Sequence, residues 1–275
     1  MALLFGTAGV PVSSPSRDTA SGIARVHELG LEAMEIEFVR GVRMGFEKAK
    51  RVRAVAKRLG IALSVHAPYY INLNSPEREK LAASVQRILD SARVGSACGA
   101  RDVVFHPGYY MKSSKENAYA RVKEQLGQIV ETLEEDGIDA TLRPETTGKR
   151  SQLGSLEEVL RLSSELERVL PCVDFAHLYA RTRGGVNSYE AFAEILGKIE
   201  AALGREALRR MHIHASGINY NKGGERAHLV LRESEFNYRA MLRALKDYRV
   251  EGVLICESPN LEEDALLLKQ EYPRV

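Results

Sequence analysis

The sequence has only three cysteines and no surplus of charge of either sign, and each shortage argues against a class of protein. Cys98, Cys172 and Cys256 lie far apart beside apolar residues, so we expect buried reduced thiols instead of a disulfide framework or a zinc finger. Lys and Arg number 39 against 37 Asp and Glu. This balance does not indicate a nucleic-acid binder, although it permits a local basic face.

The sequence also has no apolar run long enough to span a membrane, and its start, "MALLFGTAGV", has no basic leader. We therefore expect a cytoplasmic protein without a membrane partner. Low-complexity segments, long linkers and breaks in composition are missing as well, which predicts a single domain over residues 1–275. With 44% hydrophobic residues, a chain of this length can bury a sizeable core.

Short apolar segments alternate with long helical ones, and the alternation predicts an α/β protein with one (β/α)₈ TIM barrel. The predicted strands are 3–8, 33–39, 61–67, 102–108, 139–145, 172–177, 211–216 and 252–258. Clear helices between them cover 45–60, 77–99, 114–137 and 188–204. A doubly wound open sheet is the competing fold, but "GTAGVP" after the first strand is a poor match to its glycine-rich phosphate loop.

Imidazoles and carboxylates gather at the ends of the predicted strands, where a TIM barrel has its active site. From strand three onward they are His66, His106, Glu145, Asp174 with His177, His212 with His214, and Glu257. Taken singly, each has a structural explanation: His66 as a buried histidine, Glu145 as a partner of Arg143, Glu257 as a salt bridge at the rim. Their common position at one end of six strands instead indicates a shared site.

Such a site needs cations, because carboxylates and neutral histidines crowded in one pocket would otherwise repel one another or lack partners. Nitrogen and oxygen ligands without cysteine favour zinc, with manganese as the alternative. The ligands are too many for one ion, so we predict two or three. His212 and His214 alternate on one strand and face the same side. We predict that one of them binds metal and that the other supports it from behind.

Six motifs resemble the endonuclease IV family of apurinic/apyrimidinic endonucleases, in a divergent form: "SVHAPYYINL", "VVFHPG", "PETTG", "CVDFAHLYAR", "MHIHASG" and "LICESP". The resemblance implies a zinc enzyme that hydrolyses double-stranded DNA 5′ to an abasic site in base excision repair, through a hydroxide between two metals. It further implies a first zinc on His66, His106 and Glu145, and a second on Glu145, Asp174, His212 and Glu257. His214 would then support His212 from behind. Glu145, Asp174 and Glu257 would be the catalytic residues.

A third zinc would be bound by His177 with partners from the segment after strand seven. The family has an aspartate and a histidine there, separated by one residue. This chain has "GGERAHL", in which Glu225 and His228 are separated by two. The spacing makes the third site the point at which the chain departs from the family, and a two-metal hydrolase would remain chemically sensible without it.

The resemblance also implies contacts with DNA. Tyr69 and Tyr70 occupy the positions from which the family wedges side chains into the duplex. The alternative is a structural role, in which both tyrosines cover the pocket mouth. Basic residues of the predicted loops would contact phosphates, above all Arg40, Arg43, Arg181 and Lys222, with Lys112, Lys149, Arg150, Arg183 and Arg226 beside them. We expect the protein to act as a monomer.

Two other functions stay open at this point. A sugar isomerase or epimerase of the xylose-isomerase-like barrels would need only one metal on Glu145, Asp174, His212 and Glu257, which leaves His66, His106 and His228 without a role. The other hypothesis is a non-catalytic binder of damaged DNA, which is supported only by the altered spacing of Glu225 and His228.

Overall fold

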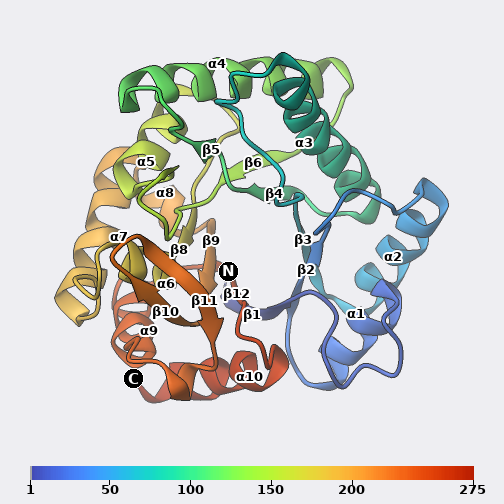
Figure 1. Cartoon of the computed structure of the whole chain (residues 1–275). Helices are drawn as coiled ribbons and strands as arrows, with labels where there is room; N and C mark the ends of the chain where they lie inside the picture. Colours follow the sequence, from blue (N-terminus) through green and yellow to red (C-terminus); the bar gives the residue numbers. More distant parts are fainter. Residues whose placement is uncertain (1) are drawn as a thin grey trace.

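Eight parallel strands form the centre of the molecule, and all eight lie where the sequence predicted strands (Figure 1). The computed structural model describes residues 2–275. The strands are β1 (Leu3–Ala8), β2 (Ala33–Glu37), β3 (Ala62–His66), β4 (Asp102–Phe105), β6 (Thr141–Pro144), β8 (Cys172–Asp174), β9 (Met211–Ala215) and β12 (Gly252–Cys256). They pair in the order β6-β4-β3-β2-β1-β12-β9-β8. Two isolated parallel bridges, Leu142 to Val169 and Glu145 to Cys172, close the ring, so the predicted TIM barrel is confirmed.

Helices follow the strands and surround the barrel. They are α1 (Thr19–Glu28), α2 (Phe46–Leu59), α3 (Arg78–Cys98), α4 (Lys115–Glu135), α5 (Leu156–Glu165), α6 (Phe175–Arg181), α7 (Tyr189–Leu203), α8 (Arg205–Leu208), α9 (Tyr238–Asp247) and α10 (Glu262–Glu271). Helix α5 begins with a capping box between Ser155 and Glu158. Helices α2 and α3 end at Gly60 and Gly99, whose left-handed φ angles of 71° and 86° suit glycine. None of the helices within residues 2–275 is long and apolar enough to cross a membrane.

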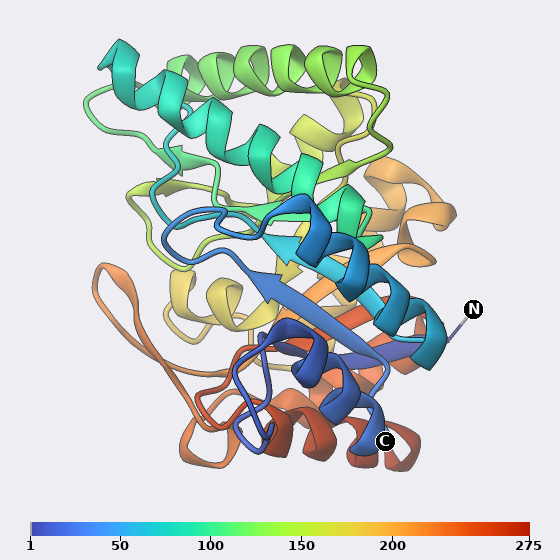
Figure 2. The same ribbon diagram turned by 90° about the vertical axis from the view of Figure 1, so that its right-hand side faces the viewer.

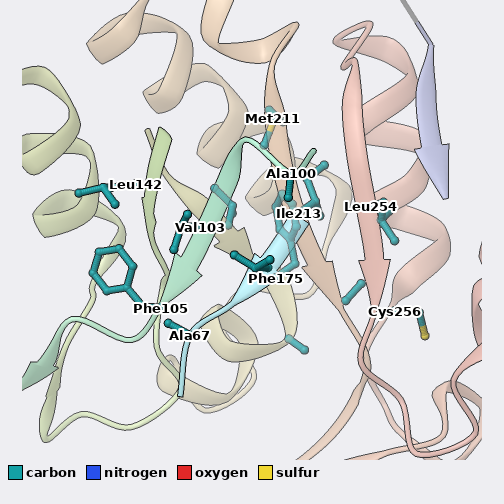
Figure 3. Close-up of a cluster of buried hydrophobic side chains, with 14 of the residues drawn as sticks. Ala67, Ala100, Val103, Phe105, Leu142, Phe175, Met211, Ile213, Leu254 and Cys256 are labelled. Carbon is teal, nitrogen blue, oxygen red and sulfur yellow. The ribbon is translucent and has the colours of Figure 1, made fainter. Parts of the chain in front are cut away.

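Apolar side chains from the strands and the helices around them form the core. Figure 3 shows part of it, with Val103, Leu142, Ile213 and Leu254 on four different strands, all almost completely buried. The barrel interior is different, because strand residues that point inward include buried ionisable side chains. The fold thus places its apolar layer outside the sheet and a polar group of residues inside it.

One strand is shorter than predicted. The sequence suggested a strand over 172–177, but β8 ends at Asp174 and α6 begins at the next residue. The Asp174 side chain caps this helix by accepting a hydrogen bond from the backbone N–H of His177 at 2.7 Å. His177 therefore lies in the first turn of a helix and not on a strand.

Two small antiparallel pairs lie outside the barrel sheet. Strands β5 (Gly108–Tyr109) and β7 (Gln152–Leu153) join the loops after β4 and β6. Strands β10 (Gly217–Asn221) and β11 (Gly224–Leu229) form a hairpin, which projects from the side of the barrel opposite the N terminus (Figure 2). This side holds the carboxyl ends of the barrel strands, and the hairpin stands over them.

Candidate metal centre

Glu145 is the centre of the candidate site. It follows β6 directly, is completely buried, and directs Oε2 toward His66 Nε2 at 3.2 Å and His106 Nε2 at 3.0 Å. His66 is the last residue of β3, and His106 comes immediately after β4. The structure therefore brings together the first predicted group of ligands, His66, His106 and Glu145.

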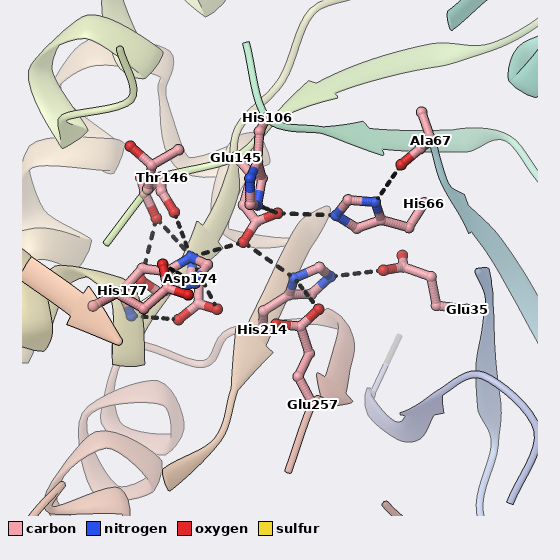
Figure 4. A network of polar contacts seen from close by, with 12 residues as sticks. Glu35, His66, Ala67, His106, Glu145, Thr146, Asp174, His177, His214 and Glu257 are labelled. Atoms are coloured by element: carbon pink, nitrogen blue, oxygen red, sulfur yellow. Dashed lines mark hydrogen bonds and ion pairs between the residues drawn. The ribbon is translucent and has the colours of Figure 1, made fainter. Parts of the chain in front are cut away.

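The other carboxylate oxygen of Glu145, Oε1, faces a second group of candidate metal ligands (Figure 4). Glu145 Oε1 lies 3.5 Å from His214 Nδ1, which in turn lies 3.3 Å from Glu257 Oε1. Asp174 completes the group, whose four members can place their ligand atoms within 4.8 Å of one another. One carboxylate thus faces two sets of candidate ligands, which is the position that the resemblance implied for Glu145.

The second group corrects the prediction for strand β9. His214 is the histidine beside Glu145, Asp174 and Glu257, whereas His212 directs Nε2 toward Glu35, 2.9 Å away. Both side chains point into the barrel, as expected from their alternation. His214 stands two positions nearer the carboxyl end of the strand, where the carboxylates gather. The roles that we expected for the two histidines are therefore exchanged in this geometry.

The third group consists of His177, Glu225 and His228. His177 Nε2 lies 3.4 Å from Glu225 Oε2 and 3.5 Å from His228 Nε2. Glu225 and His228 both come from β11 of the hairpin, and the hairpin packs against α6, which supplies His177. The loop after β6 also contacts it, since any side chain at Gly148 would collide with Glu225.

A β-bulge explains how Glu225 and His228 can face the same way. Residues three apart in a regular strand point to opposite faces. In this hairpin Tyr220 pairs with Glu225 while the adjacent Asn219 pairs with Ala227, so Arg226 is an extra residue on β11. The bulge returns His228 to the face of Glu225. The unusual spacing seen in the sequence is thus compensated by backbone geometry.

Glu35 is a residue of the site that we did not predict. It is fully buried on β2, and its two oxygens lie 2.9 Å from His212 Nε2 and 2.9 Å from His214 Nε2. Ser64 Oγ donates a third contact at 2.6 Å. The signal was present in "AMEIEFV", where Glu35 and Glu37 alternate with apolar residues on a strand that ends at the pocket. Buried glutamates on such a strand require partners.

The charges of this cluster shift the pKa values of its members in opposite directions. Burial raises the pKa of Glu145, but His106 and His214 outweigh it and hold that pKa well below its usual range. Burial lowers the pKa of His66, yet the hydrogen bond to Glu145 and the charge of Glu37 raise it to about 10. Burial raises the pKa of Asp174 to about 6, and that of Glu37 to about 8. Without metal, protonated histidines are the counter-ions of the carboxylates.

The donor set nevertheless fits divalent cations better than protons. His66 and His228 each direct Nδ1 at a backbone carbonyl, of Ala67 and Glu257 respectively, so an N–H there leaves Nε2 as the nitrogen that faces the cluster. Metal-binding histidines are held in the same way. His177 lies between two groups, because its Nδ1 is 2.9 Å from Glu145 Oε1 and its Nε2 is 3.4 Å from Glu225 Oε2. Within residues 2–275, Glu145 Oε1, Asp174 Oδ2 and His214 Nδ1 are buried and have no hydrogen-bond partner of good geometry. Cations would satisfy these atoms.

A pocket of about 410 Å³ opens above the cluster. Its wall includes Tyr69, Tyr109 and Lys149 in addition to ligand residues. Of the predicted DNA-binding residues, Tyr69, Tyr70, Arg40, Arg43 and Lys222 are exposed on this face. Arg181 corrects the prediction: its guanidinium donates to the carbonyls of Lys149 and Gln152 at 2.6 and 3.1 Å, and so holds the loop after β6.

Fold and site together define a (β/α)₈ barrel with groups of candidate metal ligands at the carboxyl ends of its strands. The chain belongs to the xylose isomerase-like TIM barrel family, whose model matches residues 23–272. It is similar to an uncharacterized protein of Methanocaldococcus jannaschii, with 51% identity over 270 residues that cover 98% of this chain and 97% of that protein. It is also similar to a probable endonuclease 4 of Symbiobacterium thermophilum, with 27% identity over 262 residues, 91% of this chain and 92% of that protein.

Many solved structures share the fold, among them an endonuclease and an epimerase-like protein. Endonuclease IV from Thermus thermophilus has a TM-score of 0.72 and 21% identity, over 98% of this chain and 100% of that one. A D-tagatose 3-epimerase-like protein has a TM-score of 0.74 and 22% identity, over 98% and 97%. The predicted resemblance to the endonuclease IV family is confirmed, on a divergent branch. The fold alone does not separate endonucleases from epimerases, because it accompanies both kinds of relative.

Proposed function

We propose that the protein is a metal-dependent endonuclease that hydrolyses the phosphodiester 5′ to an abasic site in double-stranded DNA. The observation that carries this proposal is the position of Glu145, whose two oxygens face two different groups of ligands. A carboxylate shared in this way suits cations close enough to act on one phosphate. Similarity to a probable endonuclease 4 supports the same reaction.

The groups have distinct tasks in this proposal. Two or three zinc ions, or manganese in their place, would supply Lewis acidity and lower the pKa of a water molecule. Glu145, Asp174 and Glu257 would supply the negative charge that holds the cations in the barrel, and further donors would come from His66, His106, His177, His214, Glu225 and His228. Tyr69 and Lys149 line the pocket mouth, where they would position the strand and its phosphate.

A nicking assay tests the proposal. The substrate is a duplex with one abasic site, and the matched control is the same duplex without the lesion. We expect incision that a chelator abolishes and that added zinc or manganese restores, and the product should carry a 3′ hydroxyl that a polymerase extends. An abasic duplex that stays intact at micromolar enzyme with full metal occupancy would remove the proposal.

The alternative is a sugar epimerase with one metal. The second group alone, Glu145, Asp174, His214 and Glu257, could hold that ion, and the fold similarity to a D-tagatose 3-epimerase-like protein favours it. Metal content separates the two, because an epimerase would carry close to one ion per chain and the endonuclease two or three. The non-catalytic binder has lost its only support, since the bulge brings Glu225 and His228 together.

A further inference from the structure

The exposed apolar side chains of the protein lie on one face. Within residues 2–275 the exposed large hydrophobic residues are Val12, Val39, Phe46, Tyr69, Tyr70, Tyr109 and Met111. All seven belong to the loops after β1 to β4, or in the case of Phe46 to the first residue of α2. We call this set the apolar crescent. Its strands are neighbours in the sheet, so its loops lie side by side around one half of the pocket.

Hydrogen bonds hold these loops in place. Tyr69 N donates to the carbonyl of Val39 at 3.3 Å, which joins the loops after β3 and β2. The Asn72 side chain accepts from Tyr109 N at 3.1 Å, and the Asn74 side chain donates to the carbonyl of Tyr109 at 2.9 Å, which joins the loops after β3 and β4. The aromatic rings are therefore presented on a fixed backbone, so a ligand would find them already arranged.

The loops of the apolar crescent carry charge of one sign, and the carboxylates that flank them, Asp18, Glu47 and Glu77, each pair with a lysine. The segments 9–17, 38–46, 67–76 and 107–114 contain no Asp or Glu, but they carry Arg17, Arg40, Arg43 and Lys112, all exposed. The whole chain is nearly neutral, at +2, so the acidic residues are concentrated elsewhere. A basic surface with exposed aromatic rings suits a polyanion that has flat apolar faces.

We propose that the apolar crescent binds an unpaired strand of DNA, with bases stacked on Tyr70, Tyr69 and Tyr109 and phosphates on the four cations. The proposal rests on the proposed function. A duplex hides the faces of its bases, so it would satisfy the cations and leave most of the crescent in water. Tyr69 and Tyr109 also line the pocket, so the strand bound to the crescent leads into the candidate metal centre. Abasic sites in single-stranded or frayed DNA are then substrates as well.

Binding of undamaged fluorescent oligonucleotides tests this inference without cleavage. The probes are a short oligothymidylate, the corresponding thymidylate–adenylate duplex, and a baseless deoxyribose-phosphate strand of equal length. We expect the single strand to bind more tightly than the duplex and about tenfold more tightly than the baseless strand. Tyr70→Ala and Tyr109→Ala should each lower affinity for the single strand about tenfold. Tyr70→Phe, which keeps the ring, should retain it.

The outcomes distinguish this inference from the function on which it rests. Equal affinity for the single strand and the baseless strand, or alanine variants that are folded by circular dichroism and keep full affinity, would overturn the inference. If abasic duplex is still nicked in that case, the endonuclease proposal stands. If the chain neither nicks the abasic duplex nor binds any of the DNA probes, both fail, and an acidic protein partner becomes the better occupant of the crescent.

Discussion

At the scale of single residues, the site depends on Glu145. Glu145→Gln keeps the shape of the side chain and removes its charge, so cations on either side would repel each other without compensation. We expect cleavage of abasic duplex to fall by more than about a hundredfold, with an unchanged circular dichroism spectrum. Glu165→Gln, which alters an ion pair on the outer surface, serves as the control and should stay active. Full activity in Glu145→Gln would contradict the assignment.

Glu35 orients His214 without touching the pocket. Its carboxylate meets His214 Nε2, so that Nδ1 is the nitrogen that faces Glu145 and Glu257. Glu35→Gln would present an amide N–H to one of the two histidines, and metal affinity should fall about 10–100-fold. Calorimetric titration of zinc into chelator-treated protein measures this loss, and ¹⁵N spectra report the His214 tautomer. Ser64→Ala removes only the third contact of Glu35 and should bind zinc normally. Unchanged spectra and affinity in Glu35→Gln would refute the orienting role.

The sequence predicted most of the ligands because side chains at the ends of parallel strands must meet at one rim. It did not predict which of His212 and His214 would reach the cluster, because alternation defines the side of a strand but not the depth in the barrel. Glu35 was missed although its alternation with apolar residues was visible, because the sequence does not show which residues are its partners. Its partners come from strands β3 and β9, and contacts between such distant segments leave no local pattern.

At the scale of elements, the bulge at Arg226 is the feature that the sequence spacing of Glu225 and His228 does not reveal. Deletion of Arg226 would return the hairpin to a regular ladder in which Glu225 and His228 are two apart and still share a face. We therefore expect the deletion variant to keep the metal content of the unaltered chain. Inserting one alanine after Arg226 would shift His228 to the far face, and that variant should lose the metal of the third group.

Metal analysis of both hairpin variants by plasma mass spectrometry checks this prediction. Arg226→Ala is the matched control, since it changes the side chain and leaves the count of residues as it is. Loss of one ion from the deletion variant and retention in the insertion variant would show that the bulge does not align the ligands.

Helix α6 shows why the sequence predicted His177 on a strand. The apolar surroundings of His177 in "CVDFAH" fit a strand, and only the cap by Asp174 starts the helix there.

At the scale of the whole molecule, one arginine joins the strands on both sides of the barrel's closing seam. Arg143 on β6 is buried, pairs with Asp102 of β4 at 2.6 Å, and donates to the carbonyls of Pro171 and Arg210, which precede β8 and β9. In the described part of the chain, residues 2–275, the backbone pairing across this seam consists of two isolated bridges, and Thr146 adds two side-chain hydrogen bonds to Asp174 of β8. The alternation of strands and helices predicted the barrel, but it could not show how the ring closes.

Arg143→Met should lower the free energy of unfolding by about 3 kcal/mol, because it leaves a carboxylate without its counter-charge and two carbonyls without a donor. Burial raises the pKa of Asp102, but Arg143 and the neighbouring His212 together outweigh it and hold that pKa below its ordinary value of 3.8. The pair therefore stabilises the fold above that value, and the contribution is lost as pH falls below it. Urea unfolding at a series of pH values should show that the free energy of unfolding falls less steeply toward acid pH in Arg143→Met than in the unaltered protein. The same pH dependence in both proteins would contradict this account.

The hairpin has a consequence for how the protein would release its ions. Glu145, Asp174 and His214 come from the barrel itself and are completely buried, whereas Glu225 and His228 are 17% and 25% exposed on a projecting loop. Bending that loop away would free two donors of one group and leave the remaining donors undisturbed. A chelator should accordingly withdraw the ion under the hairpin first, and the partly emptied enzyme would be a distinct, isolable species.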